Sequence, residues 1–151
     1  LLDEPTSGLD PALRRTFYGL ISDLRSAGTT ILLSSHALTE LEDRTDRVII
    51  VNEGVKIADG TLDDLRGLAR LPTRLIVNLV DSEAPGRWGG TGALWRRTGQ
   101  DTVETDVFGE DKVIVLKEVT ARPADIRSLH VVEPTLDDLY AHFLGARRAA
   151  K

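Results

Sequence analysis

Two adjacent carboxylates, Asp3 and Glu4, follow the apolar residues Leu1 and Leu2. Apolar residues that end in acids are typical of a buried strand whose carboxyl end faces a ligand, since this is where open α/β sheets bind ligands. One carboxylate there can hold Mg²⁺, usually through water, and the next can orient or deprotonate a water molecule for attack on a phosphate. The same four residues also fit a strand that simply ends in solvent. The elements around them must distinguish a ligand-binding strand end from a solvent-exposed one.

The residues after these carboxylates predict helices and strands in alternation. Asp10 and Pro11 start a helix, because Asp is a favoured N-cap and Pro fits the first helical position. Gly28 ends that helix, and Thr61 caps a later one. Between them we expect a buried strand over 29–34, a short helix over 37–44 and a hairpin formed by 47–52 and 55–58. The inward face of the first helix is expected to carry Leu13, Phe17, Leu20, Ile21 and Leu24.

This alternation predicts an α/β fold with a parallel, helix-covered sheet in residues 1–70. Residues 71–151 differ in pattern and predict a small α+β domain with a split β-α-β arrangement. Its expected strands are 75–80, 102–108, 112–118 and 131–132, with a short helix over 93–97 and a final helix starting at Thr135. Runs 102–108 and 112–118 are predicted to form a hairpin. In the final helix, Leu136, Leu139, Tyr140 and Phe143 are expected to face inward.

The pentapeptide Thr-Leu-Asp-Asp-Leu occurs twice, at 61–65 and 135–139. A Thr followed three residues later by an acid matches a helix N-terminus in which the two side chains cap each other's backbone. We interpret the repeat as one capping solution used twice, not as a repeated domain.

The composition excludes several classes of protein. There is no cysteine, so neither a disulfide framework nor a thiolate metal site can form. No stretch approaches the roughly 20 apolar residues that cross a bilayer. The 19 Lys and Arg against 24 Asp and Glu give a net charge of −5, so nucleic acid is not an expected partner, although a local basic patch remains possible. The chain contains no Met and opens on Leu1, which leads us to expect further sequence upstream.

Residues 1–10, Leu-Leu-Asp-Glu-Pro-Thr-Ser-Gly-Leu-Asp, resemble the Walker B motif and D-loop of ATP-binding-cassette (ABC) ATPases. A strand that ends in Ser34-Ser35-His36 resembles the segment of the family's switch histidine, and residues 48–60 resemble its closing hairpin. The resemblance covers residues 1 to about 70. It implies that this unit is the C-terminal part of the parallel sheet of a P-loop NTPase.

The resemblance also implies a role for each matching residue. Asp3 would be the Mg²⁺-associated acid, acting through water, and Glu4 the catalytic carboxylate that polarises the attacking water. His36 would be catalytic and would bind the γ-phosphate of ATP. Such roles suit phosphoryl transfer, in which positioning and electrostatics dominate. The D-loop, which touches the partner subunit across the dimer, would be formed by Ser7, Gly8, Leu9 and Asp10.

Other motifs of the family are absent from these 151 residues. The phosphate-binding loop Gly-x-x-x-x-Gly-Lys-Ser/Thr, the Gln loop and the Leu-Ser-Gly-Gly-type signature do not occur. Backbone amides and the lysine of that loop bind the β- and γ-phosphates. We therefore expect the chain alone to be inactive, neither binding ATP appreciably nor hydrolysing it.

The resemblance implies the ATP-hydrolysing subunit of an ABC transporter, with ATP and Mg²⁺ as cofactors. Its partners would be a second ATPase subunit, in a homodimer, and an integral membrane permease, which would hold it on the cytoplasmic face of the cell membrane. Residues 34–47 and the Leu71–Pro72 junction look most like the copper-processing ATPase of nitrous-oxide reductase maturation. Two alternatives stay open: a non-catalytic truncated paralogue that acts as a dimerisation or regulatory module, and a soluble ABC ATPase without a transport role.

Overall fold

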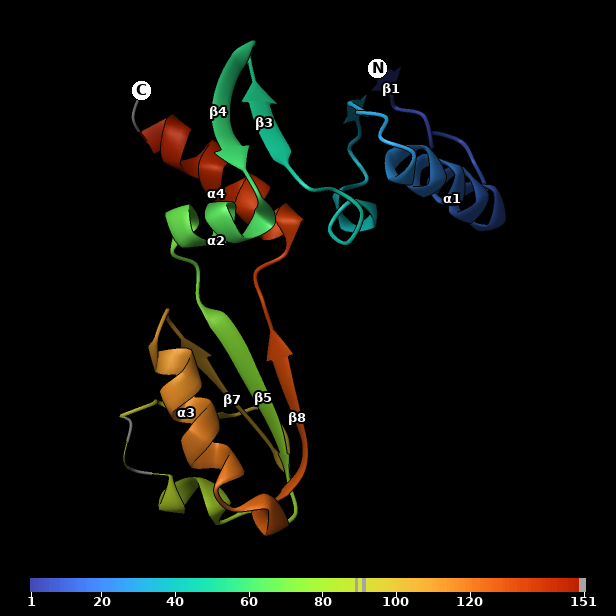
Figure 1. Cartoon of the computed structure of the whole chain (residues 1–151). Coiled ribbons are helices and arrows are strands. Elements are labelled where there is room, and N and C mark those ends of the chain that lie inside the picture. The colour runs from blue at the N-terminus through green and yellow to red at the C-terminus, as the bar shows by residue number, and fades with distance from the viewer. Residues whose placement is uncertain (89, 91, 150–151) are drawn as a thin grey trace.

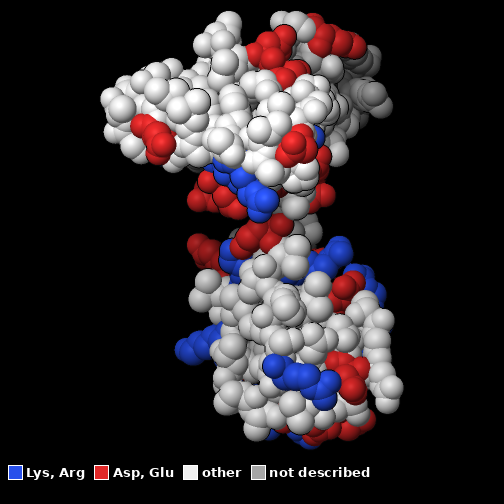
Figure 2. Space-filling view, turned by 90° about the vertical axis from the view of Figure 1, so that its right-hand side faces the viewer, with Lys and Arg blue, Asp and Glu red and all other residues white. Residues whose placement is uncertain are grey.

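The computed structural model describes residues 1–88, 90 and 92–149. The molecule has two parts joined by a narrow waist (Figures 1 and 2). The two connections between the parts, 70–72 and 133–135, form this waist. The first part contains residues 1–70 together with the C-terminal helix, and the second contains a four-stranded sheet with one long helix on it (Figure 1). None of the helices in the described residues is both long and apolar enough to cross a membrane.

The first part begins with two short parallel strands, β1 (Leu2–Asp3) and β2 (Leu33–Ser34). Between them lies α1 (Pro11–Ser26), whose N-cap is Asp10, as predicted. The expected strand over 29–34 is wrong in length, because β1 offers it a pairing partner over two residues only. The expected short helix over 37–44 is reduced to the 3₁₀ turn η1 (Leu38–Glu40).

The inward face predicted for α1 is also wrong in part. Leu13, Leu20 and Leu24 are exposed, and the helix packs instead through Tyr18. Tyr18 lies in one cluster with Leu41 and with Leu136 of the C-terminal helix. Because the β1–β2 sheet is only two residues long, it offers too little surface to bury the remaining leucines of α1 among the described residues.

The next elements form a compact group. Strands β3 (Val48–Asn52) and β4 (Val55–Gly60) make the predicted hairpin, and α2 (Leu62–Ala69) follows. The C-terminal helix α4 (Leu136–Ala149) returns from the second part to lie beside α2 (Figure 1). Its fully buried Leu139 packs in a cluster with Ile50, Ala58, Leu65 and Ala69. Tyr140 is exposed, contrary to the prediction.

The repeated pentapeptide caps both of these helices, which confirms its interpretation. In α2, the Asp64 amide donates to Thr61 Oγ1 at 3.1 Å and the Thr61 amide donates to Asp64 Oδ2 at 2.9 Å. In α4, the Asp138 amide donates to Thr135 Oγ1 at 3.2 Å and the Thr135 amide donates to Asp138 Oδ2 at 2.9 Å. The same sequence thus starts two neighbouring helices in the same way.

The second part is an antiparallel sheet in the order β6-β7-β5-β8, which is the order of a split β-α-β arrangement. Leu75, Val77 and Leu79 of β5 point to one face and are fully buried. There they pack with Trp88 and with Val115 and Val119 of the long helix. The bounds are β5 (Thr73–Leu79), β6 (Arg96–Arg97), β7 (Thr102–Val107) and β8 (Ile126–Val132), with 3₁₀ turns η2 (Ala84–Arg87) and η3 (Pro123–Asp125).

The predicted hairpin of 102–108 with 112–118 is wrong, because the second run forms the helix α3 (Asp111–Thr120). A short apolar run fits a strand or a buried helix equally well. Both sides of β7 already have strand neighbours, β5 and β6, so the run covers the face of the sheet instead. Val115 and Val119, one helical turn apart, are buried. The short helix expected over 93–97 is also absent, and Arg96–Arg97 form β6.

Candidate functional site

The predicted carboxylates lie where two parallel strands end side by side. Asp3 ends β1 and Ser34 ends β2, and the two residues are register partners. The Ser34 hydroxyl donates a hydrogen bond to Asp3 Oδ1. The amide of Glu4 donates to the carbonyl of Ser34 at 3.1 Å, and lies 3.2 Å from its hydroxyl. Ser34 therefore holds both acidic residues, a role that the sequence pattern alone did not reveal.

Glu4 and His36 meet directly. Nδ1 of His36 lies 2.8 Å from Oε2 of Glu4, and the imidazole is 80% exposed, so its other nitrogen is open to a ligand. Glu4 has a φ of +43°, in the left-handed region that non-glycine residues seldom adopt. Such strain costs about 1–3 kcal/mol and is concentrated at functional sites. The backbone turn after β1 thus places the Glu4 carboxylate beside His36.

The predicted D-loop follows as two tight turns. The amide of Ser7 donates to the carbonyl of Glu4 at 3.1 Å, and the amide of Leu9 donates to that of Thr6 at 3.2 Å. Gly8 has a φ of +76°, which favours glycine at this position. Ser7 and Gly8 are exposed, whereas the Asp10 carboxylate accepts hydrogen bonds from the first turn of α1. Asp10 therefore has a helix-capping role in addition to the dimer contact implied for it.

The segment behind His36 is tied to α1. Glu40 of η1 forms an ion pair with Arg14 and accepts a hydrogen bond from the Tyr18 hydroxyl at 3.3 Å. Arg14 also donates to the carbonyl of Leu9 at 2.9 Å. These contacts join the D-loop, α1 and residues 34–42, which we call the histidine segment. Sequence reasoning missed the two contacts of Glu40, because their partners are more than 20 residues apart.

The residues at the strand ends suit Mg²⁺ held largely by water and phosphate. Magnesium is usually bound by one or two carboxylates, with water and substrate phosphates as its other ligands. Asp3 offers a hard carboxylate oxygen of this kind next to the Ser34 hydroxyl. Within the described part of the chain, no three His, Asp or Glu residues are grouped as a complete metal site. A carboxylate of this kind fits a magnesium ion whose other ligands are water and phosphate.

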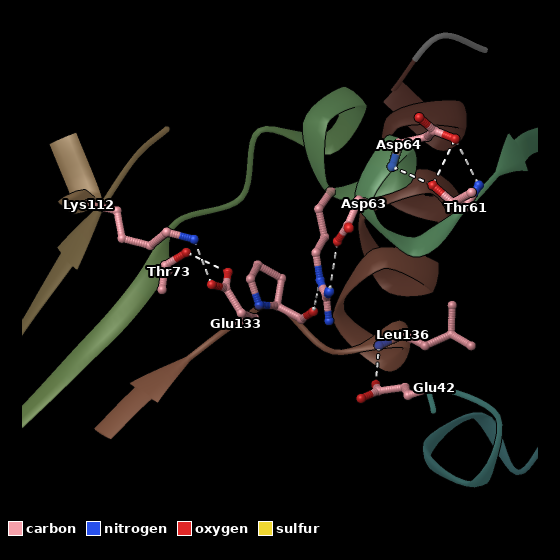
Figure 3. A network of polar contacts seen from close by, with 10 residues as sticks. Glu42, Thr61, Asp63, Asp64, Thr73, Lys112, Glu133 and Leu136 are labelled. Carbon is pink, nitrogen blue, oxygen red and sulfur yellow. Dashed lines mark hydrogen bonds and ion pairs between the residues drawn. The ribbon is translucent and has the colours of Figure 1, made fainter. Parts of the chain in front are cut away.

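A second polar network connects the histidine segment to the waist (Figure 3). Glu42 accepts a hydrogen bond from the Leu136 amide at the start of α4. Arg66 of α2 donates to the carbonyl of Pro134 at 3.0 Å. Glu133 accepts from Lys112 and from Thr73, each at 2.7 Å, and Lys112 lowers the pKa of Glu133.

The fold is consistent with a portion of a P-loop NTPase: two parallel strands lie side by side, an acid pair stands at the end of β1, and a histidine follows β2. A family model described as "AAA domain, putative AbiEii toxin, Type IV TA system" matches residues 1–42. This segment contains the acids, the D-loop and His36.

Within the P-loop NTPases, the curated relatives of the chain are ATP-binding proteins. The chain is 35% identical, over 99% of its length, to a daunorubicin resistance ATP-binding protein, DrrA3, of Streptomyces coeruleorubidus, and it covers 49% of that protein. It is 30% identical over 96% of its length to the linearmycin resistance ATP-binding protein LnrL of Bacillus subtilis, of which it covers 49%. A DrrA protein of Streptomyces peucetius is 28% identical over 95% of the chain, which covers 46% of it. The chain is similar to ATP-binding proteins of ABC transporters, and it spans about half the length of these relatives.

Proposed function

We propose that the chain supplies the water-activating and phosphate-sensing side of an ABC-type ATPase that drives transport through a membrane permease. The observation that carries the proposal is the 2.8 Å contact between Glu4 and His36 at the ends of two neighbouring strands. An exposed imidazole fixed by a carboxylate suits a group that must report on a ligand in solution.

In this proposal Glu4 orients the attacking water. Its Oε2 is held by His36, which leaves Oε1 to accept a hydrogen bond from water. Asp3, held by Ser34, offers its carboxylate toward a magnesium ion through water. Mg-ATP, when bound, supplies the phosphoryl group and the cation that neutralises its charge.

His36 would hydrogen-bond the γ-phosphate through Nε2. When Nδ1 donates to Glu4, Nε2 can donate as well only if the imidazole is protonated, because a neutral ring carries one N–H. A phosphate oxygen beside Nε2 would accept this second hydrogen bond. His36 would therefore link the presence of the γ-phosphate to the position of Glu4.

We infer the protein's partners and its location from its similarity to ATP-binding proteins of ABC transporters. We propose a second ATPase subunit across Ser7, Gly8, Leu9 and Asp10, and a permease that holds the protein at the cytoplasmic face of the membrane. Two of the relatives are named for daunorubicin and linearmycin resistance, so we favour export of a toxic small molecule. Copper processing stays a prediction from residues 34–47. A neighbouring gene for a periplasmic copper-binding protein would support it.

A chimera tests the catalytic role. We expect residues 1–151, joined to the upstream half of the DrrA3 relative, to hydrolyse Mg-ATP. Glu4→Gln should retain ATP binding and lower turnover about 10²-fold or more, since a positioned general base contributes about 10²–10⁴-fold. His36→Ala should lower turnover more than binding. Glu110→Gln, a change in a carboxylate of the second part, serves as control.

Two results would refute the proposal. Unchanged turnover in the Glu4→Gln chimera would remove its catalytic role. A folded chimera that binds ATP without hydrolysing it would favour the non-catalytic module. For the chain alone, isothermal titration with Mg-ATP should give no micromolar binding, because the phosphate-binding loop is absent from the 151 residues.

A further inference from the structure

The two edges of the four-stranded sheet differ in a way that bears on assembly. One edge, β6, consists of Arg96 and Arg97 alone, both exposed, and short charged strands protect an edge from pairing. The other edge, β8, is seven residues long, and among the described residues its one strand neighbour is β5. Val131 and Val132 on β8 are each 44% exposed. Residues 128–132 of this edge contain no Lys, Arg, Asp or Glu, so this stretch lacks the charges that protect β6.

The backbone direction along β8 follows from the bonds of β5. The Leu79 amide donates to Asp101 on the β7 side, whereas the Val80 amide donates to Asp125 on the β8 side. Since successive residues of a strand point their backbone groups to opposite sides, even-numbered residues of β5 bond to β8. Their register partners on β8 are the even-numbered residues 128, 130 and 132. Leu129 and Val131 therefore direct their N–H and C=O groups outward.

We propose that β8 pairs antiparallel with β8 of a second copy, centred on His130, to form one continuous sheet. Leu129 and Val131 of each copy would then exchange backbone hydrogen bonds with Val131 and Leu129 of the other. This is edge-strand addition, in which main-chain bonds provide affinity and side chains provide specificity. The proposal is independent of the proposed ATPase function and of the D-loop contact.

Charge favours a second copy in this register. Within β8 there is no acidic residue, although the chain carries a net charge of −5. Pairing centred on His130 sets Arg127 opposite Glu133 of the other copy, twice. Alternation from Val131 places Glu133 on the α3 side of the sheet, where it contacts Lys112, and Arg127 lies at the register shift of β8 beside Leu79. A register centred on Leu129 would instead oppose Asp125 and Glu133, and like charges opposite each other are destabilising.

Cysteine cross-linking tests the register, since the chain has no cysteine. His130 would face its own copy in a non-hydrogen-bonded pair, whose Cα atoms lie about 4.5 Å apart, within disulfide range. We expect His130→Cys to form a covalent dimer under mild oxidation without nucleotide. Val55→Cys, on the exposed hairpin strand β4, is the control. Equal cross-linking of both variants would overturn the proposal.

A charge substitution tests the surface. Val131→Lys would place two lysines in the interface and should weaken the dimer about tenfold or more. Val55→Lys, at a similarly exposed strand position, should leave it unchanged. The dimer is measured by sedimentation and by slowed cross-linking in His130→Cys/Val131→Lys, because exposed leucines of α1 can also associate. A chain that stays monomeric at all concentrations, or a dimer that Val131→Lys leaves intact, would overturn the proposal.

Discussion

The contact between Glu42 and the start of α4 gives the most direct test of how the histidine segment is held. The Glu42 carboxylate accepts from the Leu136 amide, 94 residues away in sequence (Figure 3). Leu136 is itself buried against Tyr18 and Leu41. Loss of Glu42 should therefore loosen α4 from the segment that carries His36.

The magnitude follows from two separable effects. A hydrogen bond to a charged group contributes about 1.5–3 kcal/mol. A negative charge near a helix N-terminus contributes about 0.3–1 kcal/mol. Glu42→Gln keeps an acceptor and loses the charge, so it should cost about 0.3–1 kcal/mol of unfolding free energy. Glu42→Ala loses both and should cost about 1.5–3 kcal/mol.

Urea unfolding of the whole chain measures these costs, and hydrogen exchange at the Leu136 amide locates them. Exchange should be faster in Glu42→Ala than in Glu42→Gln. Asp43→Ala, an exposed carboxylate next in the chain, should change stability by no more than about 0.5 kcal/mol. Equal costs for the alanine and glutamine variants, or a cost for Asp43→Ala as large as that for Glu42→Ala, would refute the reasoning.

Three further predictions concern stability. Leu139→Ala empties a fully buried site between α2, α4 and the hairpin and should cost about 2–5 kcal/mol in urea unfolding; a cost below 1 kcal/mol would contradict this packing. Thr61→Ala and Thr135→Ala should each cost about 1 kcal/mol, because each removes the same N-cap, and thermal melts that separate them widely would show that the two caps differ. Two basic partners lower the pKa of Asp59 to about 2, so its contribution to stability should be present above the ordinary Asp pKa and be lost as the pH falls toward 2. In Asp59→Asn, the free energy of unfolding should fall less as the pH is lowered toward 2. An unchanged dependence on pH would exclude Asp59 as its source.

Features that depend on near neighbours could be predicted from the sequence. The N-caps of α1, α2 and α4 and the turn of the β3–β4 hairpin each involve residues at most three positions apart. Their side-chain chemistry determines the local backbone whatever lies around them. The acids and the histidine are predicted in the same way, because contiguous residues carry their motifs.

Only the tertiary structure decided which surfaces meet. The run 113–116 is apolar enough for a strand, but both sides of its predicted partner β7 are occupied by β5 and β6, and the run became part of α3. Leu20 and Leu24 continue the apolar face of α1 but stay exposed, while Tyr18 packs with the distant Leu136. The site follows the same rule: Ser34 reaches Asp3 across 31 residues, and Glu42 reaches α4 across 94. A sequence pattern indicates which side chains are stabilised by burial or by a polar partner. The identity of the partner depends on chain segments that meet only after folding.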